Sequence, residues 1–223
     1  MRLSGTKRLA IAIERALYVA DTNNHHIQNF SNNGTFITKW GTADGQFSYP
    51  EGVAVDPVGN VYVVDYGNNR IQKFDNTGHF ISKCGSSGSA DGQFSGPNGI
   101  AVDSTGNVYV ADTGNDRIQK FSNNGTFITS WGSSGSGNGQ FETPLYLAVD
   151  HSGNLHVADN GNNRIQKFSN NGTFITSWGG SGFGNGLFNG PGGIAVDSAG
   201  NVYVTDYDNN GSGFKQSGSD GCG

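Results

Sequence analysis

Short apolar runs alternate with turns rich in glycine and asparagine along nearly the whole chain. In one stretch of the sequence the apolar residues gather in four runs, at 99–103, 108–112, 117–121 and 126–131. Each run has the length of a β-strand and ends in residues that favour turns. The Asn-Asn-Gly segment at 123–125 is typical of a tight hairpin. This pattern predicts an antiparallel meander of four strands.

The meander recurs along the chain in tandem. Residues 118–132 return unchanged at 165–179, and a Phe-x-x-Pro motif returns every 47 residues, beginning at 47, 94, 141 and 188. The first two runs of a unit are apolar on both faces, whereas the third mixes polar and apolar residues. Tandem meanders with sandwiched inner strands and wetter outer strands predict an all-β fold, a β-propeller of four-stranded antiparallel blades.

The repeat pattern weakens at both ends of the chain. Residues 1–16 read as a divergent N-terminal segment with room for one inner strand, 17–206 as the propeller, and 207–223 as a degenerate tail rich in Gly and Ser. We expect about four full blades plus an incomplete fifth that lacks its last strand. Three arrangements stay open: an open arc or fragment of a larger propeller, irregular closure, or self-association through the open sheet edges.

The repeated residues also carry a family resemblance. The segments 97–132 and 144–179 read like PxGIAVDxxGxVYVADxxNxRIQxF followed by GxFxxxWG, and this pattern resembles the NHL repeat family. The resemblance implies a propeller, most often six-bladed, that recognises protein or RNA and in some relatives acts as an enzyme. The signatures of WD40 and kelch repeats are absent.

Composition limits the kinds of partner. The chain has 13 Lys and Arg against 18 Asp and Glu, so its formal net charge is −5, which disfavours RNA although it leaves RNA open. Its two cysteines provide neither a disulfide framework nor a zinc module. No signal peptide and no membrane span are apparent. We therefore expect a soluble protein, cytoplasmic by default, with no membrane partner.

An Asp-x-x-Asn motif lies between the second and third runs of every unit. We expect each Asp to cap the turn and to pair with the Arg that opens the third run. The predicted structural residues are Asp21, Asp65, Asp112, Asp159 and Asp206. The neighbouring positions form a predicted binding ring: His25, His26, Asn68, Asn69, Arg70, Asn115, Asp116, Arg117, Asn162, Asn163 and Arg164.

Other candidate residues are interpreted as structural. The Phe of each Phe-x-x-Pro motif is expected to fill the space between blades. His156 replaces a repeated Tyr and Cys84 replaces a repeated Trp, so both are expected in the packing, Cys84 with less packed volume. The five histidines do not recur in register, so we expect no metal site, no cofactor and no catalytic residue.

Near-identical blades supply the same groups everywhere, whereas catalysis needs different groups at one place. The sequence therefore favours a non-enzymatic scaffold that binds a protein partner. Two alternatives remain: a lyase or hydrolase that draws channel metal ligands from positions such as His151 or His156, and an RNA-binding NHL module.

Overall fold

Five antiparallel sheets follow one another along the chain in the computed structural model, which describes residues 7–11, 16–41, 46–207 and 215–217. Blade 1 consists of β1 (Lys7–Ile11), β2 (Ala16–Asp21), β3 (His26–Ser31) and β4 (Phe36–Trp40). Blade 2 consists of β5 (Pro50–Val55), β6 (Val61–Asp65), β7 (Arg70–Phe74) and β8 (Phe80–Cys84). Each blade is a meander, with strands paired in chain order.

Blades 3 and 4 repeat this topology. Blade 3 consists of β9 (Ile100–Val102), β10 (Val108–Asp112), β11 (Arg117–Phe121) and β12 (Phe127–Trp131). Blade 4 consists of β13 (Pro144–Val149), β14 (Leu155–Asp159), β15 (Arg164–Phe168) and β16 (Phe174–Gly179). In blades 1 to 3 a short 3₁₀ turn joins the second and third strands: η1 (Thr22–Asn24), η2 (Tyr66–Asn68) and η3 (Thr113–Asn115).

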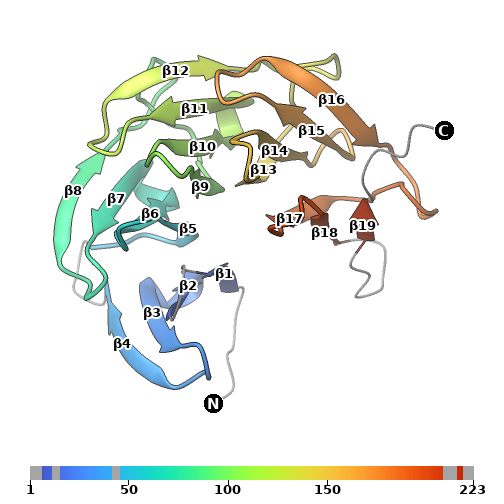
Figure 1. Ribbon diagram of the computed structural model, residues 1–223. Helices are drawn as coiled ribbons and strands as arrows, with labels where there is room; N and C mark the ends of the chain where they lie inside the picture. The colour runs from blue at the N-terminus through green and yellow to red at the C-terminus, as the bar shows by residue number, and fades with distance from the viewer. Residues whose placement is uncertain (1–6, 12–15, 42–45, 208–214, 218–223) are drawn as a thin grey trace.

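The sheets stack face to face around a common centre, and the ring they form is open (Figure 1). First strands line the centre, and β4, β8, β12 and β16 lie on the outside. Blade 1 and the fifth sheet flank the gap. The predicted all-β propeller of four-stranded blades is therefore confirmed, as an incomplete propeller.

The fifth sheet contains a strand that the sequence did not predict. It consists of β17 (Pro191–Val196), β18 (Val202–Asp206) and the short β19 (Lys215–Ser217), which pairs with β18 from Val204↔Lys215 to Val202↔Ser217. The expectation of a degenerate tail at 207–223, with no last strand in the fifth blade, did not include β19. Strand pairing is made by backbone groups, so β19 forms although the Arg-Ile-Gln pattern of the other third strands is missing.

Apolar residues fill each seam, by which we mean the space between two neighbouring blades. The seam between blades 3 and 4 contains Tyr109, Ile118 and Trp131 of blade 3 and Phe168 of blade 4. The Phe of the Phe-x-x-Pro motif completes each cluster, as expected, and its four copies are buried: Phe47, Phe94, Phe141 and Phe188. The core is thus a series of seams.

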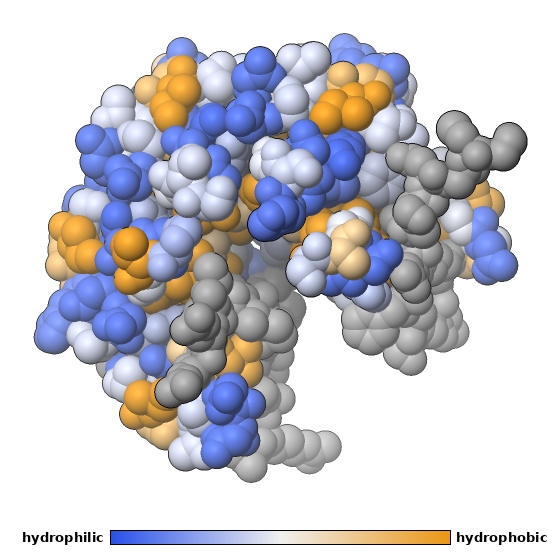
Figure 2. Space-filling model, in the orientation of Figure 1, coloured by the Kyte–Doolittle hydropathy of each residue, from blue (hydrophilic) through white to orange (hydrophobic). Residues whose placement is uncertain are grey.

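The outer strand of each of these blades carries an exposed apolar residue, and these residues do not form one continuous patch. Ile81, Ile128 and Ile175, on β8, β12 and β16, are each 48% exposed. Figure 2 accordingly shows separate hydrophobic patches on the rim with hydrophilic residues between them. Within the described part of the chain, no helix is both long and apolar enough to cross a bilayer.

Candidate functional site

A buried carboxylate joins the second and third strands of each blade to the linker that enters it. In blade 3, Asp112 is fully buried and accepts hydrogen bonds from Arg117 Nε at 2.7 Å, Gln119 Nε2 at 2.9 Å and Asn115 Nδ2 at 2.9 Å. It also accepts one from the backbone N–H of Ser95 at 2.8 Å. We call this set the carboxylate network. Four donors around one carboxylate compensate for its burial.

The carboxylate network recurs in the other blades. Asp65 and Asp159 each bond their Arg through Nε at 2.7 Å. In blade 1, His26 stands in place of the Arg, is buried, and places Nε2 3.4 Å from Asp21 Oδ2. In the fifth sheet, Asp206 accepts the backbone N–H of Asn189.

The remaining guanidinium N–H groups bond backbone carbonyls of the preceding linker. Arg117 Nη2 donates to the carbonyls of Ala90 and Gln93 at 2.8 and 3.0 Å. Arg164 donates to three linker carbonyls, those of Ser136, Gly137 and Gln140. These arginines therefore hold the linkers in place, and the donors named here bond within the protein.

The residue that follows the Asn of each Asp-x-x-Asn motif connects one blade to the following one. His25, Asn69, Asp116 and Asn163 all have left-handed backbones, with φ between 49° and 54°. Each side chain accepts a hydrogen bond from a backbone N–H in the loop entering the next blade: Tyr49 N to His25 Nδ1, Gly96 N to Asn69 Oδ1, Thr143 N to Asp116 Oδ1 and Gly190 N to Asn163 Oδ1. These four bonds measure 2.8 to 3.0 Å. The predicted ring is therefore brought together on one face, where it joins neighbouring blades.

The residue after the network Asp also bridges a seam in three blades. Thr22 Oγ1 donates to Pro50 O at 2.8 Å, Thr113 Oγ1 to Pro144 O at 2.7 Å, and Asn160 Nδ2 to Pro191 O at 3.0 Å. In blade 2 this position is Tyr66, whose ring instead lies beside the Gly96 backbone and is 40% exposed.

A second tyrosine, Tyr49, stands on the loop next to the Tyr66 turn, with its ring toward blade 1. Tyr49 occupies a left-handed position, φ 50°, where two of the other three loops have glycine. It is 50% exposed, and its ring packs edge-on against His25 with centroids 4.6 Å apart. A hydrogen bond from Gly67 N to Ser48 O holds the two tyrosine-bearing loops together. We call Tyr49, Tyr66 and His25 the aromatic patch.

The structure also places the histidines considered as channel ligands. His156 is buried in blade 4, with Nε2 3.1 Å from Asp150 Oδ2 and its ring edge-on to Trp178. Burial lowers the pKa of His156, with the Lys167 charge acting in the same direction against the Asp150 interactions. Its Nδ1 is buried and has no hydrogen-bond partner in the described residues. His151 is exposed. No three metal-ligating side chains gather anywhere in the described part of the chain.

Sequence reasoning anticipated the Asp–Arg pairs but did not single out the aromatic patch. Its signal was available in the repeat alignment: Tyr49 stands where other units have Gly96, Thr143 or Gly190, and Tyr66 where blades 1, 3 and 4 have Thr or Asn, the fifth sheet having Tyr207. Tyr49 is larger than its counterpart in every other copy, and Tyr66 is larger than its counterparts in blades 1, 3 and 4.

Comparison with known proteins agrees with this geometry. Residues 47–74, 94–121 and 188–210 match the family model of the NHL repeat. A comparison with curated proteins found no match.

Among solved structures, the chain is similar to a streptogramin B lyase, with TM-score 0.68 and 16% identity over 91% of this chain and 62% of that one. It is also similar to virginiamycin B lyase from Staphylococcus aureus, with TM-score 0.66 and 14% identity over 92% and 64%. A chain in a nidogen/laminin complex gives TM-score 0.66 and 20% identity over 89% and 71%. The chain thus spans less than two thirds of the two lyases, and these likenesses concern the fold.

Proposed function

From the premise that this chain carries NHL repeats folded into an open propeller arc, we propose that it is a non-enzymatic scaffold that binds a protein partner. The contact surface is the face that bears the connections between second and third strands. The observation that carries the proposal is the aromatic patch, because it departs from the repeat at exposed positions.

The patch has the chemistry of a protein interface. Tyrosine presents a large, rigid contact area with a polar tip, and it is enriched among residues that dominate binding energies. Tyr49 also occupies a backbone conformation that is unfavourable for a residue with a side chain. Strain of this kind is tolerated where a residue serves a function, and a glycine would relieve it.

Two features argue against the alternatives. An RNA-binding face needs free cations, but the guanidinium groups of Arg117 and Arg164 are occupied by Asp112, Asp159 and linker carbonyls. A metal-dependent lyase needs converging ligands, and His156 is instead packed within the fold against Trp178. The nidogen/laminin complex is a protein–protein assembly by its name, which is consistent with a scaffold role on this fold.

A pair of substitutions tests the proposal. Tyr49→Gly and Tyr66→Thr give blade 2 the residues of other copies, so the fold is expected to be retained. Wild-type and doubly substituted protein are immobilised, and proteins retained from an extract of the source cells are quantified by mass spectrometry. We expect a partner that the double variant loses, and the purified partner should then bind wild-type protein in a direct titration.

The matched control changes an exposed apolar residue outside the patch. Val58 is 83% exposed in the turn between β5 and β6. The Val58→Ser variant should retain the same partner as wild type. Equal retention by the double variant and by wild type, or turnover of a lactone or amide substrate by the purified chain, would contradict the proposal.

A further inference from the structure

One seam of the propeller lacks the aromatic side chain that fills its counterparts. In the seam between blades 1 and 2, Trp40 packs edge-on against Tyr18 with centroids 5.8 Å apart and tilted against Phe74 at 6.1 Å. The backbone of Gly78, in the hairpin turn of the next blade, lies against the indole so closely that a Cβ there would be 2.8 Å from it.

The seam between blades 3 and 4 has the same arrangement. Trp131 lies 6.4 Å from Tyr109 and 6.1 Å from Phe168, and Gly172 covers it. In both seams, therefore, a tyrosine, a phenylalanine and a glycine form a site that holds one indole ring. We call these three residues the indole socket.

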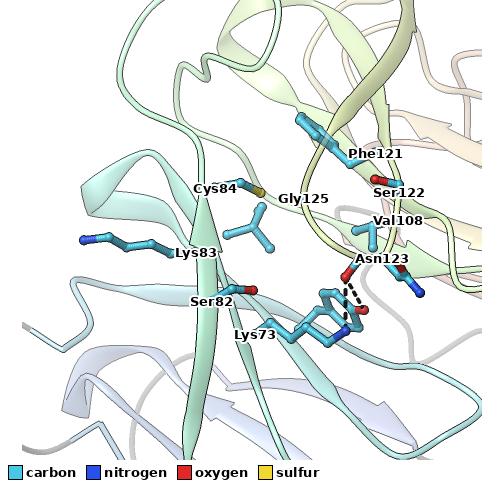
Figure 3. A pocket seen from close by; sticks show the side chains of 11 residues that line it. Lys73, Ser82, Lys83, Cys84, Val108, Phe121, Ser122, Asn123 and Gly125 are labelled. Atoms are coloured by element: carbon cyan, nitrogen blue, oxygen red, sulfur yellow. Dashed lines mark hydrogen bonds between the residues drawn. The ribbon is translucent and has the colours of Figure 1, made fainter.

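In the seam between blades 2 and 3 the indole socket is complete but holds no indole. Tyr62, Phe121 and Gly125 are all present, and Cys84 takes the position of the tryptophan. These residues line a pocket together with Ile71 and Val108 (Figure 3). In Figure 3 the Cys84 sulfur faces Gly125 across the seam, and the Lys83 side chain points away.

Two polar groups at this pocket already have partners. Lys73 Nζ and the Tyr62 hydroxyl both donate to Asn123 O, at 3.0 and 3.3 Å. Ser82 and Ser122 also line the pocket, together with apolar side chains and the Cys84 thiol. Burial raises the pKa of Cys84 to about 11, so at neutral pH this thiol is uncharged. An uncharged apolar ligand therefore suits the pocket better than an ion.

We propose that the pocket between blades 2 and 3 binds a small, uncharged planar aromatic molecule the size of an indole. The cavity that these residues line is about 20 Å³, room for about one water, because the turn lies against Cys84: a Cβ on Gly125 would be 3.1 Å from the Cys84 Cβ. An indole is larger than this cavity, so the proposal requires the turn at 122–126 to move outward when a ring enters. The same five residues, Ser-Asn-Asn-Gly-Thr, form the turn at 169–173 that covers Trp131. This turn sequence can therefore accommodate an indole.

The test uses 5-fluoroindole as the probe and the full chain as the protein. Binding is followed by ¹⁹F NMR, with unlabelled indole as competitor. Wild-type protein should bind the probe saturably and release it to indole. Cys84→Trp supplies the missing ring from the protein itself and should weaken binding at least about tenfold, whereas Cys84→Ala keeps the socket open and should bind as well as wild type. Equal binding by Cys84→Trp, or no saturable binding by wild type, would overturn the proposal.

A second measurement needs no folded variant. Alkylation of Cys84 by N-ethylmaleimide is timed with and without indole, and the modified peptide is identified by mass spectrometry to separate it from Cys222. A ring in the socket covers the thiol, so saturating indole should slow alkylation of Cys84. An unchanged rate would contradict the proposal. Neither experiment depends on the protein partner proposed above.

Discussion

The seam between blades 3 and 4 and the seam between blades 2 and 3 contain the same tyrosine, phenylalanine and glycine, but only the first contains a tryptophan. Trp131 fills the first seam, and Cys84 leaves a pocket in the second. The carboxylate networks beside both seams are nearly identical.

This comparison separates two kinds of residue in the repeat. Residues of the carboxylate network connect strands, linkers and loops, so each blade needs them. Residues that only fill space can change in one blade while the backbone around them persists. Cys84 is a departure of the second kind, whereas Tyr49 and Tyr66 are departures at exposed loop positions; the two proposals above rest on these residues.

Loss of a network carboxylate should have the largest effect. Asp112→Ala leaves the partly buried Arg117 guanidinium and the buried Gln119 amide without their shared acceptor, so we expect a loss of about 3–5 kcal/mol in the free energy of unfolding. Urea unfolding monitored by circular dichroism measures it. Asp112→Asn, which keeps the shape and part of the hydrogen bonding, should lose less. A loss no greater than that from a surface substitution would show that the network is dispensable.

Removal of the tryptophan from the seam between blades 3 and 4 should have the second-largest effect on stability. Trp131→Cys converts the seam between blades 3 and 4 into a copy of the one beside it and should cost roughly 2–4 kcal/mol, because a large ring is removed and a cavity remains. The same variant should gain a second site for 5-fluoroindole, and the stoichiometry by ¹⁹F NMR checks this. A single site after this substitution would mean that tyrosine, phenylalanine and glycine do not suffice to form the socket.

Replacing Tyr49 by glycine should change the free energy of unfolding less than the substitutions above, and in the opposite direction. Tyr49→Gly removes a side chain from a left-handed position and should leave stability unchanged or raise it by up to about 1 kcal/mol. The urea concentrations at the unfolding midpoints of the variant and of wild type measure this difference. As a control, Asn69→Ala removes the acceptor for Gly96 N and should lower stability by about 1 kcal/mol. A marked loss in Tyr49→Gly would make Tyr49 a structural residue.

The smallest predicted effect concerns the histidine of blade 4. Because burial lowers the pKa of His156, the unfolded chain takes up its proton first as the pH falls below about 6.5, and the folded state loses stability there. Asp150, whose pKa is lowered to about 2 by hydrogen bonds that outweigh its burial, remains charged across this range. His156→Tyr, which restores the residue of blades 2 and 3, should show a smaller loss between pH 7.5 and 5.5 when both proteins are unfolded in urea. Parallel pH profiles would contradict this prediction.

The repeat itself determined much of the structure. Strand periodicity, Asn-Gly turns and the constant spacing of Phe-x-x-Pro predicted four-stranded blades, buried seam phenylalanines and Asp–Arg pairs, because each depends on neighbours within one unit or on the unit being repeated. The same alignment predicted that Cys84 replaces a tryptophan and leaves less packed volume.

Contacts between units were decided by the tertiary structure. The sequence did not reveal that Asn69, Asp116 and Asn163 accept backbone N–H groups of the next blade, since those partners lie 27 residues away. It did not show that Tyr49 packs against His25 of blade 1 while Tyr66 lies against Gly96, because these contacts join different blades. Nor did it predict β19, since backbone pairing can form a strand without the side-chain pattern of the repeat. Local periodicity specifies a blade, whereas stacking the blades specifies which of their residues meet.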